Sequence, residues 1–284
     1  MKIKLRTIFL TSVILLSISF VIIVLSINKS DNTPTLNQVV TNNEPVVQTE
    51  RAVEPIAEKI SSIPTGQTTN ELSMPILMYH HIRDYIDEND KIGTNLSVSP
   101  GKFASQLDLI QSRGYTTTTF QEVARGQIPA KPIILTFDDG YLNFYQNAFP
   151  ELRKRDMSAV SYVISGFNGE DYMGESEIKE IDGAGFEIGS HSISHPDLTM
   201  ITQEKARREI LESKSNLENL IGHKVISFCY PAGKENTEVV SLVKEAGYSY
   251  ATTTKSGMAN TQDGPLLLKR YRVNSDTNIS SYLK

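Results

Sequence analysis

The chain has 284 residues of ordinary composition, with 39% hydrophobic and 21% charged residues. These proportions exclude a wholly disordered chain, a collagen-like chain and a polytopic membrane protein. The single cysteine, Cys229, excludes an intramolecular disulfide framework and a multi-cysteine zinc cluster. The net charge is −5, so the chain is also a poor ligand for nucleic acid, whose phosphates are bound by Lys and Arg.

An uncharged apolar segment runs from residue 7 to residue 27 and follows three basic residues. About 20 helical residues cross a hydrocarbon core of roughly 30 Å, so we predict that residues 1–27 form a cytoplasmic stub and a transmembrane anchor. Because the cations precede the apolar segment, the rest of the chain is expected outside the cell. A cleaved signal peptide, with a weak cleavage site at Val24 and Ser26, is the alternative, and it also exports the remainder.

Residues 28–73 are rich in Asn, Thr, Ser, Gln, Pro and Val and show no sustained helical or strand period. We interpret them as a flexible extracellular linker that holds a folded head away from the membrane. The folded, catalytic part is then expected at residues 74–284.

From residue 74 onwards, short apolar runs alternate with amphipathic segments of helical length. The expected strands are 75–79, 132–137, 158–164, 186–190, 225–230 and 248–254. The expected helices are 102–113, 141–155 with a kink or boundary at Pro150, 202–221 with Thr202 as its cap, and 237–246. This alternation predicts an α/β domain with a largely parallel sheet, either a barrel or a doubly wound sheet. In both folds ligands bind at the carboxyl ends of the strands.

Two adjacent carboxylates, Asp138 and Asp139, come directly after the expected strand 132–137. Such carboxylates repel each other, but beside a cation one of them can be a ligand and the other a general base. The alternative is an ordinary turn, because Asp-Gly is a common turn dipeptide and Gly140 follows.

Two histidines, His191 and His195, follow the expected strand 186–190. Their spacing would let both imidazoles reach one metal ion if the segment formed a helical turn. The alternative is a pair of exposed histidines or a single hydrogen-bonded histidine in the core.

Three weaker signals lie at other strand ends. His80 and His81 follow the expected strand 75–79, and either is individually more typical of a structural residue. The segment 228–233 forms a tight loop that could present a backbone N–H to an oxyanion, or a plain strand-to-helix turn. Near the carboxyl end, Arg270 and Arg272 alternate onto one face, where one could orient a carboxylate or both could be surface charges.

Taken together, these segments resemble the polysaccharide deacetylases of carbohydrate esterase family 4. The resemblance covers residues 74–273, and its specific part is TFDDG followed by HSISHP and then YPAG. The opening ILMYHHI and the closing LKRYRV resemble the branch of poly-N-acetylglucosamine deacetylases of biofilm systems.

The resemblance implies a distorted (β/α) barrel that holds a divalent metal, usually zinc, with Co²⁺, Ni²⁺ and Fe²⁺ also compatible. The metal ligands would be Asp139, His191 and His195, and Asp138 would be the general base for an attacking water. A backbone N–H of the YPAG loop, which we place at Ala232, would stabilise the oxyanion.

Two departures from the family pattern reassign other roles. Many members carry the Arg that orients the base where this chain has Cys229, and we expect Arg270 to replace it. Many members use a late His as general acid, but this chain has none after His223, so His80 is expected in that role. The resemblance also implies substrate contacts from three further residues: Tyr141, Tyr230 and Pro231.

The expected protein is therefore a membrane-tethered, monomeric N-deacetylase of N-acetylglucosamine units in a cell-surface glycan, either poly-N-acetylglucosamine or peptidoglycan. Loops 83–95 and 167–175 are expected near the substrate, the first mainly as a solvated acidic rim. The alternatives are an O-deacetylase of acetylated xylan or muramic acid, and a glycan-binding surface protein that has lost activity.

Overall fold

The computed structural model describes residues 73–284, so the predicted anchor and almost all of the predicted linker lie outside the described residues. Between residues 73 and 284, no helix has both the length and the hydropathy that a membrane span requires. Residues 73–284 correspond to the expected folded head.

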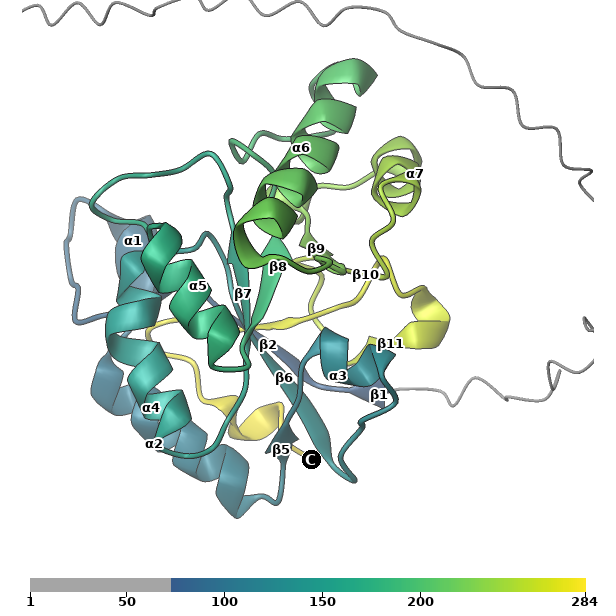
Figure 1. The fold of residues 1–284 in the computed structure, drawn as a ribbon. Helices are drawn as coiled ribbons and strands as arrows, with labels where there is room; N and C mark the ends of the chain where they lie inside the picture. Colours follow the sequence, from purple (N-terminus) through teal and green to yellow (C-terminus); the bar gives the residue numbers. More distant parts are fainter. Residues whose placement is uncertain (1–72) are drawn as a thin grey trace, which may run out of the picture. The chain divides into compact units, whose positions relative to one another are not determined.

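The centre of this part is a sheet of eight parallel strands, which are surrounded by helices (Figure 1). Seven strands lie in the spatial order β10-β9-β8-β7-β6-β2-β12, and β5 pairs with the start of β6. Their bounds are β2 Ile76–Tyr79, β5 Thr116–Thr117, β6 Pro132–Phe137, β7 Val160–Val163, β8 Glu187–Ser190, β9 Ser227–Cys229, β10 Tyr250–Thr252 and β12 Tyr271–Arg272.

The strands form a parallel α/β half-barrel, because neighbours in the sheet follow one another in the chain and no reversal of order occurs between β6 and β10. The two ends of the sheet are connected by the stretch before β12. Leu268 exchanges backbone hydrogen bonds of 2.9 Å with Ala251 and Thr253 of the β10 side, and β12 then pairs with β2. This confirms the predicted parallel α/β domain and excludes the doubly wound alternative.

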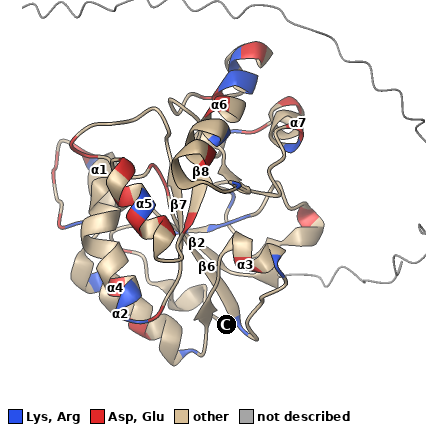
Figure 2. Cartoon of the chain, in the orientation of Figure 1, with Lys and Arg blue, Asp and Glu red and all other residues tan. Residues whose placement is uncertain are grey.

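The helices pack around the sheet and, with the loops, carry nearly all of the charged residues, whereas the strands carry few of them (Figure 2). They are α1 Lys91–Leu96, α2 Pro100–Ser112, α3 Phe120–Ala124, α4 Phe149–Arg153, α5 Glu175–Gly183, α6 Gln203–Ile221 and α7 Thr237–Glu245. Thr202 caps α6 as predicted, since its side chain accepts a hydrogen bond from the Lys205 amide.

The predicted helix 141–155 is confirmed as one helical run over residues 142–153, whose middle is π-helical. A π-helical turn, Phe144–Ala148, leads into α4, where Pro150 occupies the first turn and has no amide hydrogen to leave unpaired. Tyr141 lies before the helix, in an isolated antiparallel bridge with Tyr172. Pro150 therefore lies where the π-helical part gives way to the α-helical part, and both ends of the helix lie within two residues of the predicted ones.

Short elements complete the described chain. β1 Ser73–Met74 pairs with β11 Ala259–Asn260, and β3 His81–Ile82 pairs with β4 Ser97–Val98. Three 3₁₀ turns occur at Pro231–Gly233, Thr261–Asp263 and Ile279–Ser281.

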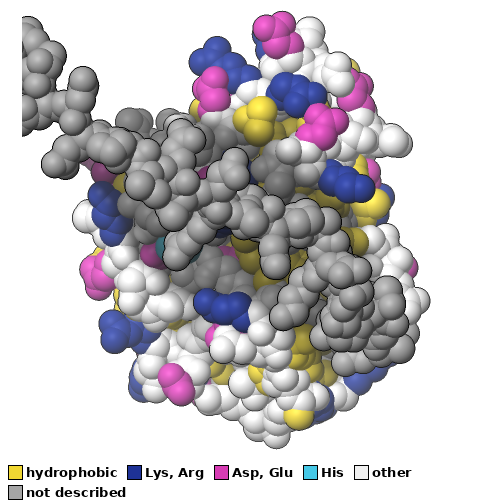
Figure 3. All heavy atoms as spheres, turned by 45° about the vertical axis from the view of Figure 1, so that its right-hand side comes forward, with side chains coloured by type: hydrophobic (Ala, Val, Ile, Leu, Met, Phe, Trp, Pro, Cys, Tyr) yellow, Lys and Arg dark blue, Asp and Glu magenta, His cyan; other side chains and the backbone are white. Residues whose placement is uncertain are grey.

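The two faces of the sheet bury different sets of side chains because the strand period is two. Leu77 and Leu135 belong to the large core beneath the helices. The alternate residues Ile76 and Ile134 belong to a smaller cluster that also contains Cys229. On the face shown in Figure 3, basic and acidic side chains of the surface are interspersed, with no large area of one sign among the described residues.

Candidate metal and catalytic site

The predicted site residues meet at the carboxyl edge of the sheet. Asp138 and Asp139 follow β6, His191 follows β8, and Cys229 ends β9. Arg270 comes from the stretch that precedes β12. Parallel strands end at one edge, so residues separated by more than 130 positions become neighbours.

Asp139, His191 and His195 bring one ligand atom each to within 4.8 Å of one another. Asp139 Oδ1 lies 3.4 Å from His191 Nε2 and 3.6 Å from His195 Nε2. Two imidazoles and one carboxylate, with a further side open, are the donor set of a catalytic zinc site. These residues therefore fit the divalent metal that the sequence implies.

The histidine segment is a loop and not the helical turn that the His-x-x-x-His spacing suggested. Ser192 and His195 both have positive φ, 66° and 57°, and the Ser192 hydroxyl accepts a hydrogen bond of 2.9 Å from the His195 amide. The kinked backbone turns the His195 side chain toward His191, and their ring centroids lie 4.7 Å apart.

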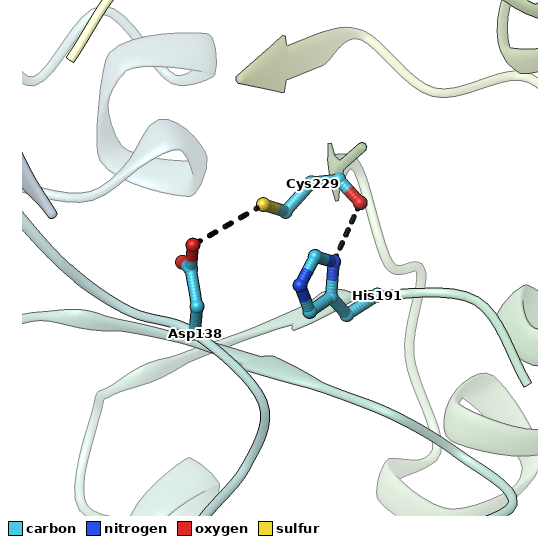
Figure 4. Close-up of side chains that lie close together, drawn as sticks. All are labelled: Asp138, His191 and Cys229. Atoms are coloured by element: carbon cyan, nitrogen blue, oxygen red, sulfur yellow. Dashed lines mark hydrogen bonds between the residues drawn. The ribbon is translucent and has the colours of Figure 1, made fainter. Parts of the chain in front are cut away.

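A hydrogen bond orients His191 for ligation. Its Nδ1 donates to the backbone carbonyl of Cys229 at 2.7 Å, as Figure 4 shows, and this leaves Nε2 facing Asp139. Burial acts to lower the pKa of His191, but its contacts with Cys229 and Asp139 outweigh burial and raise the pKa. Burial lowers the pKa of His195, and His191 lowers it further, so His195 is already in the neutral, ligating form.

A second group of possible ligands, Asp138, His191 and Cys229, also lies within ligand distance. However, Arg270 Nη2 lies 2.8 Å from Asp138 Oδ2 and 3.2 Å from Cys229 Sγ. A guanidinium at this position excludes a second cation by charge, so we assign this group to a hydrogen-bond network and not to a metal.

Asp138 is held by a two-point ion pair. Arg270 Nη1 and Nη2 donate to the two carboxylate oxygens at 2.6 and 2.8 Å, and both residues are buried. Arg270 also donates to Thr136 Oγ1 and to the Thr253 carbonyl, which fixes its plane. Burial acts to raise the pKa of Asp138, but the charge and hydrogen bonds of Arg270 outweigh it and lower the pKa. Asp138 is therefore an ionised carboxylate with a fixed direction.

His80 lies on the other side of Asp138, with Nε2 4.0 Å from Oδ2, which is too long for a hydrogen bond. Its Nδ1 is buried and has no hydrogen-bond partner among residues 73–284. Burial lowers the pKa of His80, and the nearby Arg272 and Arg270 oppose the effect of the two aspartates. The side chain is thus neutral near pH 7 and lies within reach of a proton that moves at Asp138.

Ala232 lies in the turn Pro231–Gly233 and has φ 52°. The following amides, of Gly233 and Lys234, donate to the carbonyls of Tyr230 and Pro231 within the turn. Within residues 73–284 no hydrogen bond of the Ala232 amide is found, and the residue is exposed. A free backbone N–H in the turn that follows β9 is the kind of donor that an oxyanion site requires.

The three expected substrate contacts differ in their surroundings. Tyr141 is half-buried beside Asp139, and its ring stacks on His81 at 3.7 Å between centroids. Tyr230 and Pro231 are buried, and the Tyr230 hydroxyl donates to the Leu266 carbonyl at 3.0 Å. Both side chains pack inside the fold and support the turn that carries Ala232, and their expected contact with substrate stays a prediction.

Glu209 of α6 is a site residue that the sequence interpretation missed. Its carboxylate accepts hydrogen bonds from the amides of Ile193 and Ser194 at 2.8 and 2.9 Å, and from the Ser194 hydroxyl at 2.7 Å. These bonds hold the loop between the two histidines. In the sequence Glu209 is only one of several charged residues on a polar helix face, so no local signal distinguishes it.

We expect Glu209→Ala to lower zinc affinity roughly 10–100-fold, the range seen when supporting partners of metal ligands are lost. The amides of Ile193 and Ser194 would lose their acceptor, and the loop that carries His195 would loosen. Zinc titration with a competing chelator measures the effect. Glu212→Ala, an exposed glutamate of the same helix, is the matched control. Equal affinities in both variants would contradict the assignment.

Comparison with known proteins agrees with this geometry. The family model described as polysaccharide deacetylase matches residues 125–251. The YxkH protein of Bacillus subtilis strain 168, whose name assigns it provisionally to the polysaccharide deacetylases, is 30% identical over 222 residues, which cover 76% of this chain and 77% of that protein. The chain therefore belongs to the polysaccharide deacetylase family, and it is an enzyme of that class.

Two further relatives are more specific in name. The solved structure of the Streptococcus pyogenes deacetylase PplD in complex with acetate is 29% identical, with a TM-score of 0.70, and covers 75% of this chain and 97% of its own. The poly-beta-1,6-N-acetyl-D-glucosamine N-deacetylase of Staphylococcus aureus strain MSSA476 is 23% identical over 248 residues, or 78% of this chain and 86% of the relative.

Proposed function

We propose that the protein is a metal-dependent hydrolase that removes N-acetyl groups from N-acetylglucosamine units of a cell-surface polysaccharide. The observation that carries the proposal is the placement of an ionised, Arg270-held Asp138 directly beside the Asp139–His191–His195 ligand set. The similarity to a poly-beta-1,6-N-acetyl-D-glucosamine N-deacetylase supports a poly-N-acetylglucosamine substrate over the peptidoglycan alternative.

Asp139, His191 and His195 would hold the metal, most suitably zinc, which when bound supplies Lewis acidity toward a water and the acetamide carbonyl. Asp138 then accepts the proton of the attacking water, because Arg270 keeps it ionised and fixes its oxygens. The Ala232 amide donates a hydrogen bond to the carbonyl oxygen as that oxygen gains negative charge. The neutral His80 takes up the proton that Asp138 gained from the water and passes it to the sugar nitrogen as the C–N bond breaks, so that acetate and a free amine result.

Arg270 would act as a positioning residue in this scheme. Its guanidinium contacts Asp138 but lies buried beneath it, so it does not reach the reacting atoms. Tyr141 would contact the substrate from the rim, next to Asp139.

We also propose that residues 7–27 anchor the chain in the membrane with the hydrolase outside the cell. The support is the uncharged apolar segment and the basic residues before it. A polymeric substrate at the cell surface would then be within reach of the tethered site. Accessibility of single cysteines placed on either side of residues 7–27 tests this topology, and labelling from outside at residues 1–6 would contradict it.

We expect the full-length protein to release acetate from poly-β-1,6-N-acetylglucosamine, to lose this activity in EDTA and to recover it with added zinc. The reason is that no protein group among the site residues replaces a Lewis acid at the three ligands. Acetate is measured enzymatically. Acetate release from acetylated xylan but not from the N-acetylated polymer would instead support an O-deacetylase, and release from neither would support a glycan-binding protein.

A further inference from the structure

A hollow of about 380 Å³ lies beside the catalytic site, between the loop from β7 to α5 and the carboxyl-terminal half of α6. Figure 1 shows this loop as the teal arc that leads from β7 to the start of α5. None of the metal ligands, Asp138 or Arg270 lines it. Its volume lies in the range of small-ligand sites.

Uncharged polar groups without partners border the hollow. Asn168 of the loop and Asn216 of α6 are exposed and make no side-chain hydrogen bond with the described residues. The Ser165 hydroxyl is buried and also has no hydrogen-bond partner among the described residues. A buried hydroxyl without a hydrogen-bond partner lowers the stability of the fold, so a ligand that hydrogen-bonds to it would offset that penalty.

The remaining lining is apolar or only weakly charged. Ile164, Met173 and Leu217 are buried beneath the hollow, and the Phe167 ring forms part of its wall. Lys and Arg are absent from the lining, and its single acid, Glu175, is paired with Lys179 at 3.5 Å on the surface. Amide and hydroxyl groups around an apolar floor suit a neutral ligand with hydroxyl, amide and C–H faces, which is the chemistry of an N-acetylated sugar.

The same loop connects the hollow to the catalytic site. Two backbone amides of this loop donate hydrogen bonds to the segment between His191 and His195. Ser165 N donates to Ser192 O at 3.1 Å, and Gly166 N donates to Ile193 O at 2.9 Å. A Cβ on Gly166 would lie 2.6 Å from the Ile193 carbonyl oxygen, so only glycine permits this approach.

A row of aromatic rings follows the same path. Tyr141, beside Asp139, stacks on Tyr172 at 5.3 Å between ring centroids, and Tyr172 contacts Phe167 at 5.0 Å. Phe167 lines the hollow, so the Tyr172 ring connects the hollow to Tyr141, which lies beside the metal ligand Asp139. The Tyr141–Tyr172 backbone bridge holds this row in place.

We infer that the hollow is a second glycan-binding subsite, which holds an N-acetylglucosamine unit of the same polymer at a distance from the unit that is deacetylated. The identity of the sugar rests on the proposed function. The hollow would therefore contribute more to binding of long chains than to binding of a disaccharide.

The test is affinity for β-1,6-linked N-acetylglucosamine hexamer and dimer, measured by calorimetry on the zinc-loaded full-length protein, with Asp138→Asn present in every protein compared so that no acetate is released during the titration. Asn216→Trp places a large ring in the hollow from an exposed helix position, and Phe167→Ala removes its aromatic wall. Leu211→Trp is the matched control, since it adds the same ring to α6 at a 40% exposed position outside the hollow. Circular dichroism melting establishes that each variant is folded.

We expect both hollow variants to weaken hexamer binding roughly tenfold and so to remove the preference for hexamer over dimer, with no change in the control. Equal hexamer affinity in all four proteins would overturn the inference. Because binding is measured without turnover, the result decides the role of the hollow even if no acetate is released. Absence of acetate release would count against the proposed function alone.

Discussion

Asp138→Asn is expected to reduce acetate release by roughly 10²–10⁴-fold while zinc remains bound. The amide keeps the shape of the carboxylate and can still contact Arg270, but it cannot accept the proton of the attacking water. Asp138 does not belong to the Asp139–His191–His195 ligand set, so metal affinity should change little. Acetate release at saturating zinc and a separate zinc titration measure the two effects.

A substitution of the neighbouring Asp139 is the control, because it should impair zinc binding as well as acetate release. Asp139→Ala removes one of three ligands, so zinc affinity and activity should fall together. If Asp138→Asn retained activity near that of the unmodified protein, the base would have to be another group. If Asp139→Ala retained zinc, the metal site would be wrongly placed.

The strand-end motifs could be predicted from sequence because their information is local. Asp138 and Asp139 follow a run of six residues that is buried in a parallel strand, and a parallel sheet directs such residues to one edge. The helix α6 was predicted almost to the residue because Thr202 is a strong cap and its apolar residues keep a helical period over 19 residues. Helices α1, α3 and α5 were not predicted, since each is short or has only two or fewer buried positions.

Other features depend on contacts that no local pattern records. The shape of the histidine loop is set by Glu209, which comes from a helix that begins after the loop and whose partners are backbone amides. The burial of Tyr230 follows from its contact with Leu266, 36 residues away. The helix after Asp139 begins one residue later than predicted, since Tyr141 pairs with Tyr172 in an isolated bridge, and such single-residue pairing leaves no periodic signal.

The contact between Arg270 and Asp138 was predicted from the family resemblance, and the hydrophobic periodicity of the sequence could not have predicted it. The two residues are 132 positions apart, and Cys229 lies beside both of them, with Sγ 3.6 Å from Asp138 and 3.2 Å from Arg270. A thiol at this position is small enough to leave room for the guanidinium of a residue from another strand. The sequence suggested that Arg270 replaces the arginine of the family pattern only because Cys229 occupies the position where that arginine was expected.

Arg270→Met is expected to destabilise the protein by about 3–5 kcal/mol, because it leaves the buried Asp138 carboxylate without its partner. Chemical denaturation of the protein in EDTA measures the free energy of unfolding without a contribution from metal binding. Arg272→Met is the matched control: Arg272 belongs to the same segment but forms no ion pair with the described residues, so its loss should cost less than about 0.5 kcal/mol.

The size of the Arg270→Met effect should depend on pH and on Asp138. In the unmodified protein the folded-state pKa of Asp138 is lowered from 3.8, so its stabilising contribution is present above about pH 4 and is lost as the pH falls through the folded-state value. Without Arg270, burial raises that pKa, and acid then favours the folded state of the variant. The difference in stability between the two proteins should therefore shrink below pH 4. Adding Asp138→Asn to Arg270→Met should recover part of the loss at neutral pH, and a double variant no more stable than Arg270→Met would show that the arginine acts through packing and not through the carboxylate.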